Sequence, residues 1–313
     1  MAAHQIHLNI VLGFSHLLAM LWIAAQWLRA ERSWLWALGG SVAFGFSLLG
    51  GQPQYVWLAM LTVVIYGLVA WRTRAVPLCG FWVTAGRISL VGVVGLLLSA
   101  VQLLPMYHYV TRFPRPQPAG HYDFVTAGSF QWSDFLRFVL PAPGLKSSMG
   151  MHYWEAFGFV GSGALLLATL RLLDRRTWNW RVSLGVALIG VGVLLMLGSN
   201  TPLYHLLAPI PPFSLLRIPA RNVVLVALGL AILAADYLEA LTHKPNSALC
   251  HRALVLAAGG SLLLAGIAAW LLGPYSGRWA DLSVVALVLV ATSIALTSSR
   301  QVSTAVWISI GLS

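Results

Sequence analysis

Long apolar runs constrain this chain more than any other feature of its sequence. Nine runs are long enough, or nearly so, to cross a hydrocarbon core of roughly 30 Å, and a tenth is unfinished at the last residue. Hydrophobic residues make up 59% of the chain and charged residues only 9%, which a soluble domain could not accommodate without exposing too much apolar surface. The natural solvent of the chain is therefore a lipid bilayer. The runs lie near residues 8–28, 35–49, 55–71, 88–104, 156–173, 182–198, 222–241, 253–272, 282–297 and 302–313.

Helices are the expected form of these runs. Backbone N–H and C=O groups cannot stay unpaired in lipid, so a spanning segment is either a helix or part of a closed barrel. None of the runs alternates between polar and apolar residues as barrel strands do. We therefore predict an all-α, polytopic membrane protein with about nine to ten transmembrane helices, a count that the short runs at 35–49 and 282–297 leave open by one or two. No linker or repeat divides the sequence, so we expect a single transmembrane domain over residues 1–313.

Lys and Arg residues are distributed unevenly between alternate loops. Twelve of the 19 fall on one side, and seven on the other, four of these in a long polar loop at 105–155. Basic loops remain in the cytoplasm, so that loop and a second segment at 199–221 are predicted to be extracytoplasmic. The basic residues mark helix ends and form no single patch, which favours lipid headgroups and not nucleic acid as their partners. The two cysteines fall in predicted cytoplasmic loops, where a disulfide is not expected.

The loop at 105–155 is the main candidate functional surface, because it carries three of the eight acids of the chain. Acids, histidines and cations in one compartment suit proton transfer or the binding of a divalent ion. No residue is assigned as a metal ligand. The sequence predicts no definite cofactor, and the alternative is a divalent cation such as Mg²⁺. We also expect short interfacial helices here, one of them capped at Ser133 or Asp134. The candidate acids or bases are Asp123, Asp134 and Glu155, and the candidate binding residues are Arg112 and His121.

A second candidate site precedes the predicted helix at 222–241. Pro219 suits the first position of a helix, which would put Arg221 at a helix N-terminus and Arg217 just before it. Free N–H groups, the helix dipole and two guanidinium groups would together hold a phosphate at headgroup depth. The alternative is that both arginines only anchor the helix among lipid headgroups.

Three glutamines lie near the predicted outer ends of helices. Gln52 and Gln54 flank Pro53 in a turn that its glycines and proline explain by themselves, or they hydrogen-bond the hydroxyl groups of a sugar. Gln102 lies about one turn from the end of an apolar run, where it either binds substrate or forms a hydrogen bond between helices.

Five segments, taken in order, resemble one family. They are GGQPQY at 50–55, AVQLLP at 100–105, the segment from DFL to Pro141, EAFGFVG at 155–161 and LRIPAR at 216–221. They are similar to segments of the bacterial YfhO-type membrane proteins, which resemble GT-C glycosyltransferases. The similarity extends from about residue 10 to residue 245, with Gln52 where the family commonly has histidine.

The resemblance implies an enzyme of the bacterial cytoplasmic membrane that moves a sugar from a polyprenyl-phosphate carrier to an acceptor on the outer face. Arg217 and Arg221 would hold the phosphate, and a loop acid would serve as acid or base. The expected partners are membrane lipid, the lipid-linked sugar and other cell-envelope membrane proteins.

In GT-C enzymes the base usually precedes the segments matched here, so we expect this chain to be part of a longer enzyme or a non-catalytic relative. The alternatives are a transporter of lipid-linked substrates, a scaffold for a complete enzyme, and a polymerase or ligase of surface polysaccharides.

Overall fold

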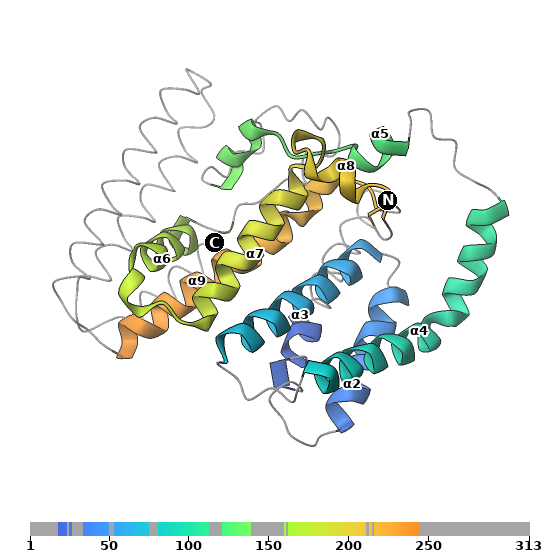
Figure 1. Ribbon diagram of the computed structural model, residues 1–313, viewed down its shortest axis with the longest axis horizontal. Coiled ribbons are helices and arrows are strands. Elements are labelled where there is room, and N and C mark those ends of the chain that lie inside the picture. The colour runs from blue at the N-terminus through green and yellow to red at the C-terminus, as the bar shows by residue number, and fades with distance from the viewer. Residues whose placement is uncertain are drawn as a thin grey trace, which may run out of the picture. The chain divides into compact units, whose positions relative to one another are not determined.

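A computed structural model describes residues 18–23, 25–26, 34–49, 53–74, 81–112, 121–138, 160, 162–210, 213–214 and 216–243. Most of these residues are helical, and no strand occurs among them (Figure 1). The prediction of an all-helical chain is therefore confirmed for the part that the structure describes. Three of the described helices are long and apolar enough to cross a membrane, namely Gln54–Thr73, Gly86–Tyr109 and Pro219–Ala240.

The predicted count of nine to ten spans stays a prediction. Shorter apolar helices match three more of the runs, with ends at Leu35–Leu49, Gly163–Leu173 and Trp180–Met196. The run at 8–28 is described only from residue 18 onward, and the runs at 253–272, 282–297 and 302–313 lie outside the described residues.

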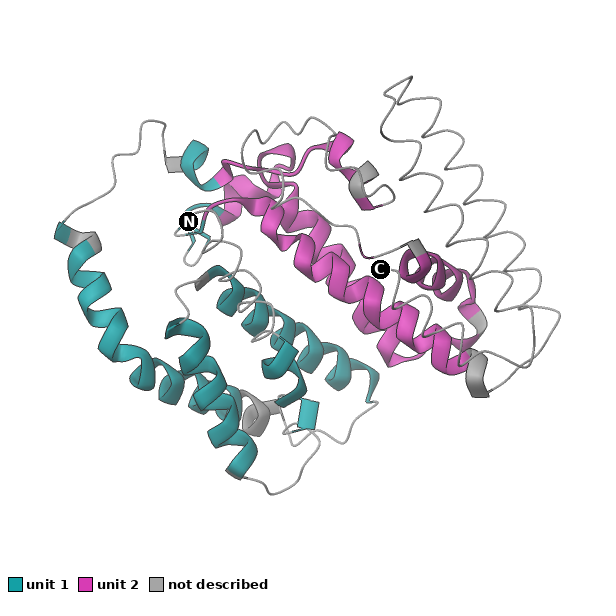
Figure 2. Ribbon diagram, turned by 180° about the vertical axis from the view of Figure 1, so that it is seen from behind, with its two compact units in different colours: residues 1–125, 208–216 teal, residues 126–207, 217–313 magenta. Residues whose placement is uncertain are grey.

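The chain divides into two compact units, which Figure 2 shows in different colours. Unit 1 comprises residues 1–125 and 208–216, and unit 2 comprises residues 126–207 and 217–313. The single transmembrane domain expected over residues 1–313 remains a prediction. Each unit has its own helices and its own packing.

Unit 1 is built on α2 (Trp34–Leu49), α3 (Pro53–Thr73) and α4 (Phe81–Arg112). α2 packs closely on α4, because two glycines remove the side chains that would hold the helices apart. A Cβ atom on Gly45 would lie 3.2 Å from the carbonyl oxygen of Gly95. The contact fixes the two helices side by side.

α4 differs from the expectation at its C-terminal end. The sequence predicts that the helix ends near residue 104 and that a loop begins at 105, but α4 continues through Pro105 to Arg112. Proline removes only one hydrogen bond of the helical ladder, and membrane helices tolerate it when the surroundings satisfy the freed carbonyl. The boundary predicted at residue 105 is therefore too early.

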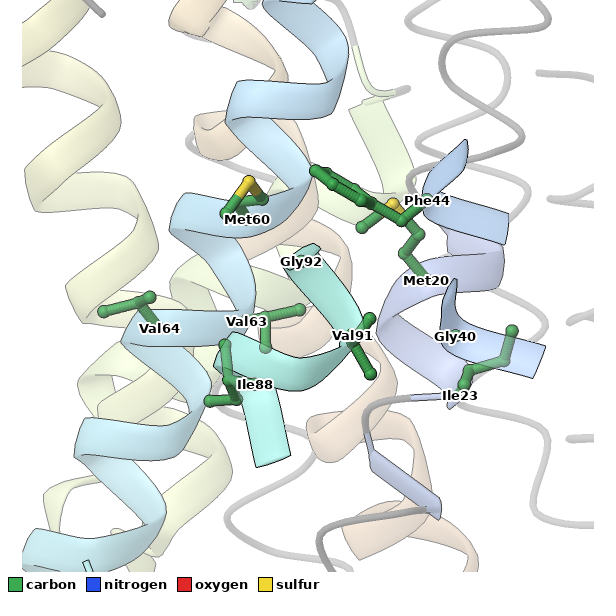
Figure 3. Close-up of a pocket in the computed structure, with 10 residues that line it drawn as sticks. All are labelled: Met20, Ile23, Gly40, Phe44, Met60, Val63, Val64, Ile88, Val91 and Gly92. Atoms are coloured by element: carbon green, nitrogen blue, oxygen red, sulfur yellow. The ribbon is translucent and has the colours of Figure 1, made fainter. Parts of the chain in front are cut away.

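An apolar cavity of about 70 Å³ lies among the helices of unit 1. Figure 3 shows its lining side chains from the segment 18–23, α2, α3 and α4. All ten lining residues are apolar, so this cavity offers no group for acid–base chemistry.

Unit 2 is built on α6 (Ser162–Leu173), α7 (Trp180–Met196) and α9 (Val223–His243), which pack on one another around a buried apolar core. α7 and α9 are antiparallel and in close contact. A Cβ atom on Gly185 would lie 3.0 Å from the carbonyl oxygen of Gly229, and one on Gly192 would lie 2.8 Å from a methyl group of Val226.

Short elements connect these helices. They are η1 (Trp132–Phe138), η3 (Arg175–Thr177), η4 (Gly198–Asn200), α8 (Leu203–Leu207) and η5 (Pro219–Asn222), and α5 (His121–Thr126) lies where the two units join along the chain. The predicted long loop thus contains two short helices in its described part. Their position at a membrane interface remains a prediction.

Candidate functional site

Three turns of unit 2 meet at the start of η5, and we call them the three-turn cluster. They comprise residues 126–131, 196–201 and 217–222. The backbone passes through the left-handed region once in each, at Gly128 (φ 78°), Gly198 (φ 50°) and Ile218 (φ 65°). Glycine adopts this conformation without steric cost, but a β-branched residue does not.

Hydrogen bonds tie the three turns together. The N–H of Phe130 donates to the carbonyl of Met196 at 2.9 Å, and the N–H of Ala220 donates to the carbonyl of Gly128 at 3.2 Å. The Asn200 amide donates to the carbonyl of Phe130 at 2.9 Å. Because each turn is bonded to another, none of them can shift alone.

Ile218 is the strained member of the cluster. A non-glycine residue in a sparsely populated backbone region costs on the order of 1–3 kcal/mol and persists only where its surroundings hold it. The Ile218 side chain is 5% exposed and lies in the apolar core with Phe130 and Val223. Gly128 makes room for it, since a Cβ atom there would lie 3.1 Å from the Ile218 Cγ2 atom. Burial of the isoleucine side chain therefore maintains the left-handed turn.

Arg217 and Arg221 lie on either side of this turn, and both are half-buried. Pro219 occupies the start of η5, as its sequence position predicts. The backbone geometry corrects the rest of that prediction, because the N–H groups expected to be free are engaged. Ala220 donates to Gly128, and Arg221 donates to the carbonyl of Ile218 at 3.1 Å. Any anion held here would depend on the guanidinium groups, with little help from the helix N-terminus.

Asp134 is buried, and its carboxylate caps η1. Its Oδ2 atom accepts a hydrogen bond from the N–H of Gln131 at 3.0 Å, and its own N–H donates to the carbonyl of Gln131 at 2.9 Å. A carboxylate that reaches back three residues in this way is one half of a capping box. Asp134 therefore takes part in capping, but as the third residue of the helix, because η1 begins at Trp132, before the cap position predicted at Ser133 or Asp134.

The other candidate residues are spread over unit 1. Asp123 is exposed on α5, Gln54 is buried in the first turn of α3, and Gln102 and Arg112 are exposed on α4. His121 begins α5, but its side chain is not described. Gln52 and Glu155 lie outside the described residues. Of the candidates that the structure describes, Asp134, Arg217 and Arg221 lie in unit 2 and the others lie in unit 1.

A second polar cluster, which the sequence analysis did not single out as a site, lies at the ends of α7 and α9 opposite the three-turn cluster. Arg171 at the end of α6 is 1% exposed, and its Nε atom donates to the Asp236 carboxylate at 2.6 Å. A second guanidinium nitrogen donates to the carbonyl of Thr177 at 2.6 Å. The Asn179 amide also donates to Asp236, at 3.0 Å, while its oxygen caps the start of α7. We call these four residues the Arg171 cluster.

The Arg171 cluster has a structural role, because it links the ends of α6 and α9 to the start of α7. The sequence predicts only that Asp236 and Glu239 face the interface or a basic loop residue; in the structure Asp236 pairs with Arg171 and Arg181, and Glu239 pairs with Arg181. The sequence pattern from which this pairing could have been predicted is a cation and an acid at the ends of two apolar runs. No group of three or more His, Cys, Asp or Glu side chains suited to a metal ion occurs in the described ranges.

No protein-family model, curated protein or solved structure matches the chain. The class of the protein therefore rests on its own features. The described part is helical and contains three helices able to span a bilayer, which indicates a membrane protein.

Proposed function

We propose that the chain is a bacterial membrane protein of the GT-C glycosyltransferase type, resembling the YfhO-type proteins. Its role would be to bind a polyprenyl-phosphate-linked sugar and transfer the sugar to a cell-envelope acceptor on the outer face of the cytoplasmic membrane. In this proposal Arg217 and Arg221 hold the phosphate. Guanidinium groups suit that task because their planar fork of donors matches phosphate oxygens.

The observation that carries the proposal is the ordered backbone of the turn between the two arginines. They flank a turn that is held by Gly128 and by the burial of Ile218. A binding group that is ordered before the ligand arrives loses less entropy on binding. The turn leads directly into α9, one of the helices long enough to span a bilayer. Both arginines therefore lie in the chain next to an expected membrane boundary, where a lipid phosphate is found.

The acids support transfer less strongly than the arginines support binding. Sugar transfer needs a carboxylate within hydrogen-bond reach of the acceptor hydroxyl. Of the two candidate acids that the structure describes, Asp134 is engaged in capping, and Asp123 is exposed on a short helix. This observation favours a second candidate function, in which the chain binds the lipid-linked sugar without catalysis, as a transporter or as a scaffold for other cell-envelope proteins.

The test measures binding and transfer separately in proteoliposomes that contain the chain. Radiolabelled polyprenyl phosphate reports binding, and sugar released from a polyprenyl-phosphate donor to an acceptor reports transfer. The double change Arg217→Ala and Arg221→Ala removes two charge-assisted contacts and should weaken binding about 10- to 100-fold. The matched control is Arg72→Ala, which removes an exposed arginine in the last turn of α3.

Each outcome distinguishes the two candidates. Transfer that needs the arginines supports the enzyme, whereas binding that needs them, with no transfer by the chain, supports the non-catalytic role. If the double variant bound polyprenyl phosphate as well as the unaltered chain does, Arg217 and Arg221 would not form the phosphate site in either candidate function.

A further inference from the structure

Ile218 is the residue of the three-turn cluster whose type least suits its backbone conformation. The other two left-handed positions of the cluster, Gly128 and Gly198, are glycines. A glycine at position 218 would adopt the same φ without steric cost, whereas the branched Cβ atom of isoleucine makes this conformation unfavourable. The presence of isoleucine must therefore be explained by what its side chain does.

The buried side chain of Ile218 restricts the turn to one conformation. It lies in the apolar core with Phe130 and Val223. A rotation of the backbone that relieved the positive φ would draw this side chain out of the core, so the core holds the turn in its strained form. Glycine has no side chain to hold and moves readily between the left-handed and right-handed regions. Isoleucine thus exchanges local strain for a single backbone geometry.

Gly128 contacts the same turn in two ways. Its carbonyl accepts a hydrogen bond from the N–H of Ala220 at 3.2 Å. A Cβ atom on Gly128 would lie 3.1 Å from the Cγ2 atom of Ile218 and 3.5 Å from its Cα atom. The φ of Gly128 is itself 78°, so alanine there would be strained as well as crowded. The backbone at Gly128 therefore fixes where the turn at Ile218 lies.

Arg217 and Arg221 stand at the two ends of this turn. The N–H of Arg221 donates to the carbonyl of Ile218 at 3.1 Å, which closes the turn. A change of φ at Ile218 would rotate the backbone of one arginine relative to that of the other. We infer that Ile218 and Gly128 are positioning residues of the proposed phosphate site, which keep the two arginines in one relative orientation before the ligand binds. This inference rests on the proposed function. Both residues act through the arginines, because neither has a side-chain donor for a phosphate.

Binding of radiolabelled polyprenyl phosphate to the full chain in proteoliposomes tests this role. Ile218→Gly relieves the strain but frees the turn, so it should weaken binding on the order of tenfold, because the arginines must then be ordered by the ligand. Ile218→Val keeps a branched, buried side chain and should retain binding. The matched control is Leu233→Ala, which removes a fully buried side chain of the same core where α9 packs on Gly185. It should leave binding unchanged.

The same change made together with Arg217→Ala and Arg221→Ala separates positioning from a purely structural role. If Ile218 acts through the arginines, Ile218→Gly should alter the residual binding by less than about twofold in that background. An equal loss of binding with and without the arginines, or an equal loss in Leu233→Ala, would overturn the inference.

Gly128→Ala disturbs the turn from its other side and provides a second, independent variant. It should also weaken binding on the order of tenfold, and only while the arginines are present. Full binding by Ile218→Gly and Gly128→Ala, beside weak binding by the double arginine variant, would overturn the positioning role and leave the phosphate site in place. Full binding by the double arginine variant would overturn the phosphate site and this inference together.

Discussion

At the scale of single residues, the three-turn cluster depends on backbone conformations that most side chains cannot adopt. Gly198 has a φ of 50°, and a Cβ atom there would overlap the Ser129 hydroxyl and lie 2.9 Å from Pro219. That hydroxyl in turn accepts a hydrogen bond from the N–H of Ser199 at 3.0 Å. Neither a small rotation nor a shift of one neighbour can make room for the extra carbon.

Gly198→Ala is therefore expected to lower the free energy of unfolding by about 1–3 kcal/mol. The measurement is unfolding of the detergent-solubilised chain by titration with sodium dodecyl sulfate, followed by circular dichroism. Gly67→Ala is the control, since no atom lies within 4 Å of the added carbon. An equal effect of the two changes would show that the left-handed turn does not limit stability.

Arg171 allows a second prediction at this scale, because it differs from Arg181 chiefly in burial. The Arg171 side chain is 2% exposed and that of Asp236 is 4% exposed, whereas Arg181 and Glu239 are 40% and 50% exposed. Removal of one partner from a buried pair leaves the other charge uncompensated and costs about 3–5 kcal/mol. Arg171→Ala should lower the free energy of unfolding by that amount, whereas Arg181→Ala should lower it by less than about 1 kcal/mol.

The double change Arg171→Met and Asp236→Leu separates charge from packing. It removes both charges and keeps similar volumes, so it should cost less than either single change. If the double variant were as unstable as Arg171→Ala, the hydrogen bonds to Thr177 and Asn179 would account for the stability instead.

Only part of the candidate site could be predicted from residue types. The positions of Arg217, Arg221 and Pro219 and a capping role for Asp134 follow from local patterns. The expectation held for Pro219, whereas Asp134 caps from inside the helix and not from the predicted cap position. The left-handed φ of Ile218 could not be predicted, because its cause is a glycine 90 positions earlier in the chain. The pairing of Arg171 with Asp236 spans 65 positions and is likewise a tertiary effect.

At the scale of elements, apolar runs predict helices well and helix ends poorly. The runs at 35–49, 55–71 and 222–241 correspond to α2, α3 and α9 within a few residues. α4 continues beyond its run because one proline does not end a helix that is otherwise favoured. Run length therefore identifies each element, whereas its last turn depends on local hydrogen bonding.

Contact between α7 and α9 depends on the small size of Gly229. A Cβ atom there would lie 2.6 Å from the carbonyl oxygen of Gly185 and 2.7 Å from a side-chain carbon of Ile189. Gly229→Ala should force the helices apart and lower the free energy of unfolding by about 1–3 kcal/mol. Gly190→Ala on α7 is the control, because nothing lies within 4 Å of its Cβ position. It should be neutral or stabilise by up to about 1 kcal/mol, since alanine favours helix.

At the scale of the whole molecule, the distribution of charge predicts an orientation that any function must respect. The phosphate proposal requires Arg217 and Arg221 on the outer face, and the excess of Lys and Arg in the other loops predicts that arrangement. The Arg171 cluster would then lie at the cytoplasmic ends of α7 and α9. Loop charges are weak signals individually, so the orientation rests on their sum.

Two exposed tryptophans of unit 2 provide a matched test of this orientation. Trp132 in η1 is 66% exposed, and Trp178 before α7 is 50% exposed. On a background with Cys79→Ser and Cys250→Ser, a membrane-impermeant maleimide applied to intact cells should label Trp132→Cys. It should label Trp178→Cys only after the membrane is permeabilised, because the reagent cannot reach the cytoplasmic side of an intact membrane. The reverse pattern would place the arginines of the three-turn cluster in the cytoplasm, where they could not hold a carrier that acts on the outer face.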